Sequence, residues 1–504
     1  MGGERRVSAC QLEPGAAVSI QEFPSIVVQL FERALQPLLS GVHGQLGLSV
    51  RYLRRKPGRG LAVIYDASAL NASRESRRST PARWVSVTLG EAALAGTQIR
   101  FAARQAQEAV LEVQAPGILQ AADLGLLVQA FPADNGLPAL AASCTTARDG
   151  PLFSALEAAA RVQLGDPGWH LLSVNADVVR YKPSSRCVIR YALKVGRTTA
   201  EGTLQRHVAL FGKVYSDPEQ ARIIFAEMHQ LYAEQAKVGQ PILPRPVGAV
   251  ETLGLTLTEA VLSPEGTEPE ALRTGLRALR PRVVRGGGGE ILDVAIPGEE
   301  LRITPIALVR LHTSTVLPAG APRTGAKEAK RVRERAGLIA AYNPSEAETA
   351  QRLAKQLGAR LEMLQPDAYR PAHGGFKASQ LLFHNRRVFI VDLDGFCLAD
   401  PALDIGYFLA YLRPSGLWYC RPGMRQWFEG SASTVNAYRQ ALREVGIGEA
   451  AAEGILQRAR LYEAAILFKI AARRVNRLNS PRPGELSAML TEIAVCLSGK
   501  SRRA

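Results

Sequence analysis

The chain has 504 residues, of which 47% are hydrophobic and 21% charged, a globular composition that excludes a fibrous or disordered protein. This length is enough for two or three domains, each with its own core. The formal net charge of +16 points to an anionic partner such as a nucleotide or nucleic acid. Because the basic residues are scattered and form no tail, we do not expect nucleic acid to be the partner.

The cysteines and the apolar segments indicate the compartment. The six cysteines have no paired spacing and no Cys/His cluster typical of a zinc site. The N-terminus runs into no apolar signal segment, and no apolar run approaches the ~18 residues of a membrane span. We therefore expect a protein of the reducing cytoplasm that has no membrane partner.

Two segments of the N-terminal half resemble each other. Residues 48–65 and 178–193 both have the pattern of a strand, a turn and a second strand. Each has a Lys-Pro pair in the turn and a tyrosine in the second strand, and a helix-like stretch precedes each hairpin (Lys56-Pro57, Tyr65 and Ile26–Leu39; Lys182-Pro183, Tyr191 and Leu152–Val162). We infer a duplicated β-hairpin module, with chance similarity of two hairpins as the alternative.

The second hairpin is followed by a strand and a helix that carry opposite charges. Val208–Tyr215 is an apolar strand with Lys213 near its end, and Glu227 lies fourteen residues later in the helix predicted over Asp217–Ala233. A buried ammonium is costly without an anionic partner, so Lys213 and Glu227 are candidates for an ion pair. The alternative is a surface lysine on an edge strand beside an ordinary helical glutamate.

Residues 264–304 separate two parts of different composition. They hold a Pro-Glu-Gly-Thr-Glu-Pro run, a helical stretch and the four glycines Gly286–Gly289, which predict a linker or an insertion. The glycines are not a phosphate loop, because the Lys-Ser/Thr of a P-loop is missing. Beyond them, Glu328–Leu364 and residues 430–498 have helical spacing, so the C-terminal half is predicted to be mainly helical.

The most informative block spans residues 373–404. It reads His373-Gly-Gly-Phe-Lys, then a Gln at 380, an apolar strand that ends in Asp392, and Asp-Pro-Ala-Leu-Asp404. Together with a helix that ends in Leu-His at His312, this order resembles the aminoglycoside phosphotransferase and choline kinase family, which has a protein kinase-like fold. The family carries His-Gly-Asp in its catalytic loop, and Gly375 stands where that catalytic aspartate is expected.

The resemblance implies an α+β, bilobal architecture. A β-rich N-lobe would span residues 151–261 and a helical C-lobe residues 262–504. Residues 1–150 would form an accessory N-terminal α/β domain that resembles a partial N-lobe, a degenerate copy without the matching lysine and glutamate.

The same resemblance implies ATP and Mg²⁺ as cofactors and assigns residues to them. Lys213, held by Glu227, would contact the α- and β-phosphates. Asp392 and the amide oxygen of Gln380 would bind Mg²⁺, which prefers hard oxygen ligands. Further nucleotide contacts would come from Ser184 and Ser185 in the phosphate-covering turn Lys182–Arg186, and from the strand between the lobes, Leu255–Val261, which contains Glu259.

The catalytic side is incomplete, because a glycine at 375 cannot accept the proton of an attacking hydroxyl. Lys377 is a candidate to bind the transferring phosphoryl group. Asp394 is a candidate base, two residues beyond Asp392 along a strand and so on the same side. His373 and Asp404 resemble residues that support the loop, and His312 is expected to be structural.

Three functions remain open on the sequence alone. General-base contributions of ~10²- to 10⁴-fold would leave a phosphotransferase weakened rather than abolished. The alternatives are a pseudokinase, which binds nucleotide or acts as a scaffold without turnover, and an unrelated role such as nucleic-acid binding through the basic surface. The acceptor, whether a sugar, an amino alcohol or an aminoglycoside, is not indicated.

Overall fold

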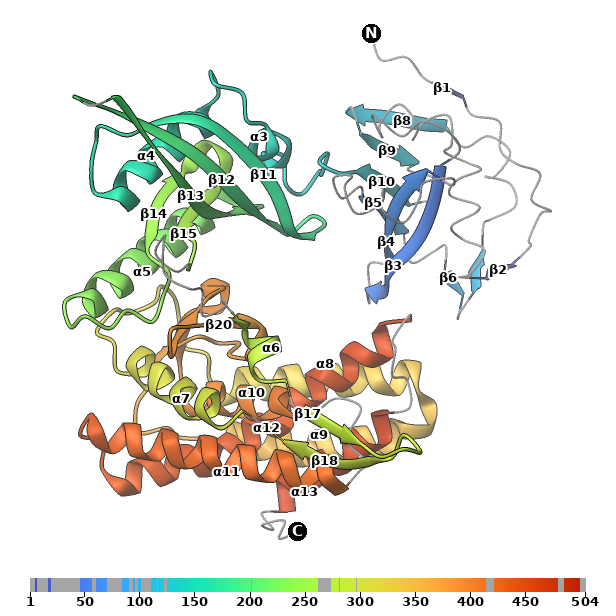
Figure 1. Ribbon diagram of the computed structural model, residues 1–504. Helices are drawn as coiled ribbons and strands as arrows, with labels where there is room; N and C mark the ends of the chain where they lie inside the picture. Colours follow the sequence, from blue (N-terminus) through green and yellow to red (C-terminus); the bar gives the residue numbers. More distant parts are fainter. Residues whose placement is uncertain are drawn as a thin grey trace. The chain divides into compact units, whose positions relative to one another are not determined.

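The computed structural model has α+β architecture, with the two largest sheets mainly in the N-terminal half of the chain and most helices in the C-terminal half (Figure 1). It describes residues 5–6, 17–19, 46–56, 60–69, 84–89, 94–95, 98–100, 110–115, 117–121, 125–200, 202–261, 273–280, 282–295, 297–413, 421–478 and 485–498. The chain forms two compact units. The sheet unit comprises residues 1–222, 247–258 and 476–479, and the helical unit residues 223–246, 259–475 and 480–504. The predicted boundaries at 150 and 261 stay a prediction.

The sheet unit contains a seven-stranded, a five-stranded and a small three-stranded sheet among its described residues. In spatial order, the first sheet is β1 (Arg5–Arg6), β8 (Val110–Ala115), β9 (Ile118–Ala121), β10 (Leu126–Ala130), β5 (Trp84–Leu89), β4 (Gly60–Ala69) and β3 (Leu46–Lys56). The second is β11 (His170–Lys182), β12 (Arg186–Thr199), β13 (Gly202–Tyr215), β15 (Leu255–Glu259) and β14 (Pro246–Val250). The small sheet is β2 (Ala17–Ser19), β7 (Gln98–Arg100) and β6 (Leu94–Ala95), and two helices accompany these sheets, α3 (Leu140–Cys144) and α4 (Pro151–Leu164).

The two hairpins predicted as copies have matching registers. At the tips, Lys56 pairs with Gly60 and Lys182 with Arg186. Between the tip and the tyrosine, the first strand of each hairpin contains one irregularity that shifts the register by one residue, and β11 has a second one beyond it, between Leu171 and Ser173. The shifts fall at different positions, yet both tyrosines end in the same place, Tyr65 opposite Val50 and Tyr191 opposite Ala176.

The likeness extends beyond the hairpins to the order of the strands. In both sheets a hairpin is followed by a third strand, β5 or β13, which lies beside the last strand of the set, β10 or β15. On the other side of β10 lies β9, and on the other side of β15 lies β14, in each case the strand that precedes it in the chain. This shared order favours duplication over chance. Of the two helix-like stretches predicted before the hairpins, Leu152–Val162 lies in α4, and Ile26–Leu39 lies outside the described residues.

The helical unit holds most of the described helices. They are α5 (Pro218–Ala236), which starts in the sheet unit, and α6 (Gly275–Ala278), α7 (Gly298–His312), α8 (Gly325–Tyr342), α9 (Ala347–Glu362), α10 (Ala402–Leu412), α11 (Arg421–Glu444), α12 (Glu449–Asn476) and α13 (Leu486–Ser498). Its strands are β16 (Arg273–Thr274), β17 (Arg282–Arg285), β18 (Ile291–Ala295), β19 (Arg370–Ala372), β20 (Leu381–His384), β21 (Arg387–Ile390) and β22 (Cys397–Ala399). None of the described helices combines the length and the apolar character needed to cross a lipid bilayer.

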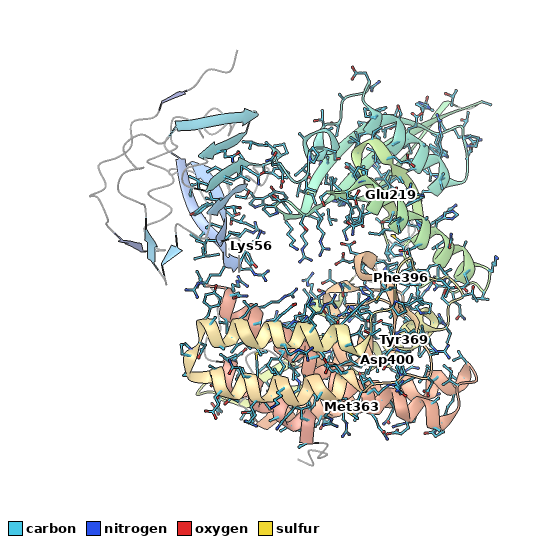
Figure 2. All side chains as sticks on the ribbon, turned by 180° about the vertical axis from the view of Figure 1, so that it is seen from behind. Lys56, Glu219, Met363, Tyr369, Phe396 and Asp400 are labelled. Atoms are coloured by element: carbon cyan, nitrogen blue, oxygen red, sulfur yellow. The ribbon has the colours of Figure 1, made fainter. Side chains whose placement is uncertain are left out.

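Apolar residues at helical spacing build the core of the helical unit. In α9 they are Leu353, Leu357 and Leu361, each at most 1% exposed, and they line one face of the helix. Met363, just after α9, is 80% exposed, whereas the Asp400 side chain is buried (Figure 2). A buried carboxylate of this kind needs charged or hydrogen-bonding partners, and Asp400 accepts hydrogen bonds from Arg458 at 2.7 and 3.3 Å.

The four glycines at 286–289 form the tip of a hairpin. They connect β17 to β18, and Gly289 has a φ of +83°, a left-handed conformation that glycine adopts without strain. The Gly286 N–H donates to the Glu290 carbonyl at 2.9 Å and closes the turn. This part of the predicted linker or insertion is therefore a folded hairpin. The Pro-Glu-Gly-Thr-Glu-Pro run, residues 264–269, lies outside the described residues.

Candidate active site

The block from 373 to 404 folds as a compact loop in the helical unit. β19 and β22 pair antiparallel just before its start and near its end, and β20 and β21 form a hairpin between them. The Ile390 N–H donates to the Ile242 carbonyl at 2.7 Å and anchors this hairpin. The strand pairs thus bring the two ends of the predicted motif together.

Asp404 contacts the start of the loop at His373 and the end of α7 at His312. Its Oδ2 accepts from the His373 backbone N–H at 2.6 Å and lies 3.3 Å from His312 Nε2. Burial opposes ionisation of Asp404, but the hydrogen bonds and charges of His312 and His373 together outweigh it, so the pKa of the carboxyl is lowered. His312 Nδ1 lies 2.8 Å from the hydroxyl of Tyr438, whose pKa burial raises well above its usual value, so the tyrosine donates. His312 thus takes part in a buried network.

His373 contacts two parts of the loop. Burial lowers the pKa of its imidazole, so the ring is neutral at pH 7. Its Nε2 lies 3.1 Å from the Val391 carbonyl and donates to it, which leaves Nδ1 as a buried acceptor. The structure therefore brings His373, Asp404 and the strand end before Asp392 into one hydrogen-bonded group.

Gln380 and Asp392 also lie together. Gln380 Nε2 donates to Asp392 Oδ2 at 3.4 Å, while Gln380 Oε1 is buried without a hydrogen-bond partner among the described residues. A bound cation fits this pair, because rotating the amide by 180° would turn its oxygen toward the carboxylate and the metal. Among the described residues no three His, Cys, Asp or Glu side chains converge on a metal site. Phosphate and water oxygens would have to supply the other ligands.

The expectation that Asp394 shares a side with Asp392 along a strand is wrong. β21 ends at Ile390, and Asp392 has a left-handed backbone with φ 70° and ψ 54°. Residues Leu393–Gly395 then form a turn of 3₁₀ helix. Side-chain alternation applies only to extended backbone, and the left-handed residue reverses the chain before Asp394.

Gly374 and Gly375 differ in whether a residue with a Cβ would fit at their positions. Gly374 has a φ of +69°, and a Cβ on it would come 2.2 Å from the Gly395 carbonyl oxygen, so glycine is needed there. A Cβ at 375 would have only Gln380 Nε2 at 3.8 Å and His373 Nδ1 at 3.9 Å within 4 Å. Position 375, where the resemblance predicts an aspartate, therefore has room for a Cβ. Nearby, Lys377 Nζ lies 5.8 Å from the centroid of the Tyr411 ring.

The predicted nucleotide residues are divided between the two units. Lys213 lies on β13, and its ammonium is 5.2 Å from the centroid of the Tyr215 ring. Glu227 belongs to the helical unit, where its Oε1 accepts from the Ala319 N–H at 3.0 Å and burial raises the pKa of the carboxyl. Glu259 ends β15 and accepts from the Arg245 N–H at 3.3 Å, and burial raises its pKa as well. The Lys213–Glu227 pair and the adenine contact stay predictions.

The predicted phosphate-covering turn already has acceptors for its N–H groups. The Ser184 N–H donates to Asp134 Oδ2 at 2.7 Å, and the Ser185 N–H donates to the Lys182 carbonyl at 3.1 Å. Asp134 Oδ2 also accepts from the Tyr181 hydroxyl at 2.7 Å. A phosphate bound at Ser184 would therefore have to displace Asp134.

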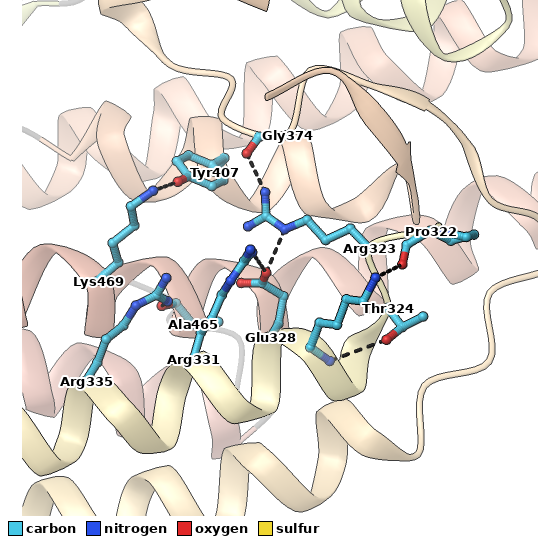
Figure 3. A network of polar contacts seen from close by, with 11 residues as sticks. Pro322, Arg323, Thr324, Glu328, Arg331, Arg335, Gly374, Tyr407, Ala465 and Lys469 are labelled. Atoms are coloured by element: carbon cyan, nitrogen blue, oxygen red, sulfur yellow. Dashed lines mark hydrogen bonds and ion pairs between the residues drawn. The ribbon is translucent and has the colours of Figure 1, made fainter. Parts of the chain in front are cut away.

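Arg323 contacts the loop and was not predicted from the sequence. Its Nη1 donates to the Gly374 carbonyl at 2.6 Å, and its Nε forms an ion pair with Glu328 Oε1 at 2.6 Å (Figure 3). Burial opposes the charge on Glu328, but the Arg323 guanidinium outweighs it and lowers the pKa of the carboxyl. An isolated Arg five residues before a Glu is no motif, so only the fold reveals this contact.

The chain was compared with known proteins. Residues 203–445 match the phosphotransferase enzyme family, and no curated protein sequence matches the chain. Similar solved structures include a glucosamine kinase in complex with glucosamine, ADP and inorganic phosphate, which is 14% identical and aligns over 92% of this chain and 95% of that one with a TM-score of 0.38.

Two further structures are of the same kind. A choline kinase from Streptococcus pneumoniae is 12% identical over 66% of this chain and 94% of its own, with a TM-score of 0.38. A putative aminoglycoside phosphotransferase from Ralstonia eutropha is 14% identical over 69% and 99%, with a TM-score of 0.41. The family match begins on β13 and ends just after α11, so the segment of this chain that matches the phosphotransferase family includes both Lys213 and the whole loop from His373 to Asp404.

Proposed function

We propose that this protein is an ATP-dependent phosphotransferase that transfers the γ-phosphoryl group to a hydroxyl of a small molecule, at a rate reduced by the glycine at 375. The observation that carries the proposal is the arrangement of the loop. His373 is fixed by Asp404, and Gln380 lies against Asp392, inside the segment that matches the phosphotransferase family. The residues that support the loop and those proposed for the metal thus occur in one connected structure.

Lysine, glutamate and serine side chains are proposed for the nucleotide. Lys213, paired with Glu227, would neutralise the α- and β-phosphates, and Ser184 and Ser185 would cover the phosphates once Asp134 is displaced. Asp392 and Gln380 would hold Mg²⁺, which when bound neutralises charge on the phosphates. Their oxygen chemistry suits that ion, and the unpartnered Gln380 Oε1 supplies an acceptor for it.

The catalytic loop offers no carboxylate at position 375 for the proton of the attacking hydroxyl. Glycine at 375 can neither position the hydroxyl nor accept its proton. Lys377 supplies positive charge for the transferring phosphoryl group, but a protonated lysine is a poor base. The remaining catalysis would come from positioning and charge neutralisation, which carry much of phosphoryl transfer.

A second candidate, a pseudokinase, is favoured by one observation. Within 4 Å of a Cβ at 375 there are only a glutamine nitrogen and a histidine nitrogen among the described residues, and no carboxylate. Such a protein would bind Mg·ATP through Lys213, Asp392 and Gln380 without turnover.

The first experiment is a calorimetric titration of Mg·ATP into the full chain. Wild type, Lys213→Ala and Asp392→Asn are compared with Lys355→Ala and Asp149→Asn, which remove the same charges at exposed positions. Both candidate functions require magnesium-dependent binding that is weakened in the first two variants and unchanged in the controls. No binding at millimolar nucleotide in wild type would reject both.

The second experiment separates the two candidates. Gly375→Asp is compared with its isosteric control Gly375→Asn in ADP formation over a panel of sugars, sugar phosphates, sugar acids and amino alcohols. A native enzyme shows turnover in wild type and gains on the order of 10²- to 10⁴-fold in Gly375→Asp but not in Gly375→Asn. A pseudokinase shows turnover only in Gly375→Asp.

A further inference from the structure

We propose that the acceptor bound beside this loop carries an anionic group, a phosphate or a carboxylate, held by basic side chains from the loop, from α12 and from the region of α8. The inference rests on the proposed function, because it names the substrate class of the same site. The residues that we call the basic cluster are Arg323, Arg335, Lys377, Lys469 and Arg473.

Helix α10 connects the basic cluster to the loop through two tyrosines. Lys469 Nζ donates to the Tyr407 hydroxyl and lies 4.6 Å from the centroid of its ring. Arg473 Nη1 donates to the Tyr411 hydroxyl at 3.1 Å, and Lys377 Nζ lies 5.8 Å from the centroid of that ring. The tyrosine rings stack with their centroids 5.9 Å apart. Lys377 of the loop and the two cations of α12 therefore lie around one aromatic pair.

Three members of the basic cluster, Arg335, Lys469 and Arg473, have neutral hydrogen-bond partners. Glu328 forms ion pairs with Arg323 at 2.6 Å and with Arg331. Arg335 Nη1 donates to the Ala465 carbonyl at 3.1 Å. In the part of the chain that the structure describes, Arg335, Lys469 and Arg473 form no ion pair with a carboxylate. Figure 3 shows Lys469 directed at Tyr407 and Arg335 at Ala465, whereas Glu328 binds Arg323 and Arg331.

This concentration of like charge is costly to the protein. Burial, and then the nearby Arg473 and Arg335, lower the pKa of the Lys469 ammonium to about 6. Burial also lowers the pKa of the Arg335 guanidinium, to about 10. On α12, Lys469 and Arg473 are one helical turn apart, a spacing at which like charges repel. A bound anion would remove this repulsion and supply the missing counter-charge.

The position of the cluster favours the acceptor as its ligand. Arg323 donates to the carbonyl of Gly374, the residue directly before the position of the missing base. Lys377 follows that position by two residues. An acceptor hydroxyl delivered to the loop would therefore bring the rest of its molecule near these side chains. A phosphate or carboxylate would be attracted there, whereas an amino group would be repelled.

The test measures binding without nucleotide. Glucose 6-phosphate, gluconate, glucose and glucosamine are titrated calorimetrically into wild type, Lys469→Met, Arg473→Gln, Lys213→Ala and the exposed control Lys355→Met. We expect binding of the two anionic sugars and none of the neutral or cationic one. The affinity should fall on the order of tenfold in Lys469→Met and in Arg473→Gln, and stay unchanged in Lys213→Ala and Lys355→Met. Thermal unfolding of each variant confirms that it is folded.

The outcomes separate this inference from the proposed function. The inference is overturned if glucosamine binds better than glucose 6-phosphate, if no anion binds, or if anion binding is lost in Lys213→Ala and kept in Lys469→Met. That last pattern would place the anion on the nucleotide residues. Anion binding that depends on Lys469 in a protein that does not bind Mg·ATP would support an anion site and reject the phosphotransferase.

A pH series adds a second readout. A carboxylate keeps its charge between pH 6 and 8, so with gluconate only the protein titrates. An anion favours protonated Lys469, so binding raises its pKa, takes up a proton at pH 7.5, and weakens as the pH rises above 6. The charged or titratable groups around Lys469 are Arg473 on α12, Arg335 and Glu328 on α8, Arg323 before α8, Lys377 in the loop and Tyr407 on α10. An affinity that does not change with pH in wild type, or that changes equally in Lys469→Met, would contradict this coupling.

Discussion

Thr88 in the first sheet and Lys213 in the second occupy the same position in the strand register. Thr88 pairs with Ala62 and Lys213 with Val188, and each pair lies two residues from the hairpin tip. After Lys213 the chain continues into α5, which carries Glu227, whereas no helix is described between β5 and β9. Both sheets keep the hairpin and the order of strands, but the charged residues proposed for nucleotide occur in the second alone. The order of strands therefore does not depend on the chemistry.

The residue before each of these positions differs as well. Gly212 in the second sheet faces Tyr191, and a Cβ there would come 2.5 Å from its ring and 2.9 Å from Leu255. The first sheet has Val87, which is buried, at that place, opposite Val63. Tyr65 and Tyr191 are both fully buried at matching positions. The residues packed around them differ, because the second sheet has Gly212 where the first has Val87.

Exchanging the two register-matched residues should have the largest effect. Lys213→Thr gives the second sheet the residue of the first, and we expect Mg·ATP affinity to fall roughly tenfold to a hundredfold through loss of charged hydrogen bonds. Thr88→Lys should add no second site, because no matching glutamate follows. Calorimetry checks both predictions, through the affinity of Lys213→Thr and the stoichiometry of Thr88→Lys. A second bound nucleotide in Thr88→Lys would contradict the assignment of the first sheet as degenerate.

Gly212→Val should have the next largest effect. It places the valine of the first sheet against Tyr191 and Leu255, and overpacking of this kind costs about 1–3 kcal/mol of unfolding free energy. Gly248→Ala on β14 is the matched control, because its Cβ would meet neighbours only at 3.7 and 3.8 Å. Urea unfolding measures both variants. Equal midpoints would show that the second sheet tolerates the packing of the first.

Removing the two tyrosine hydroxyls should have the smallest effect. The Tyr191 hydroxyl donates to the Ser143 carbonyl at 2.7 Å, whereas that of Tyr65 is buried without a hydrogen-bond partner among the described residues. Tyr191→Phe should therefore lower the unfolding free energy by about 1 kcal/mol, and Tyr65→Phe should leave it unchanged or raise it. If thermal unfolding shows that Tyr65→Phe is the more destabilised variant, the stabilising tyrosine hydrogen bond lies in the first sheet.

The sheets and helices were predictable from the spacing of apolar residues in the sequence. The expected sheets in the N-terminal half and helices in the C-terminal half are confirmed. The repeated Lys-Pro turn and tyrosine predicted two hairpins with matching registers at their tips. The glycine run was harder, because four glycines fit both a linker and a tight turn, and only the pairing of β17 with β18 decides between them.

The site was predictable where its residues are close in the sequence. The order of the motif residues from His373 to Asp404 predicted that they form one loop. The predicted alternation of side chains along a strand was wrong at Asp392, because this non-glycine residue takes a left-handed backbone that no local pattern predicts. Arg323, Lys469 and Arg473 escaped notice because each looks like a solvated residue of an ordinary helix or turn. Their proximity is a product of packing between α8, α10 and α12.

The space beside Gly375 bears on how easily this position could carry a carboxylate. The backbone there does not have the positive φ of Gly374, and a Cβ at this position would meet only Gln380 Nε2 at 3.8 Å and His373 Nδ1 at 3.9 Å within 4 Å. A codon for glycine and one for an acidic residue differ by a single base. The site is therefore one nucleotide change away from an acidic side chain whose Cβ meets its described neighbours only at 3.8 and 3.9 Å, so selection for turnover should recover such a variant readily.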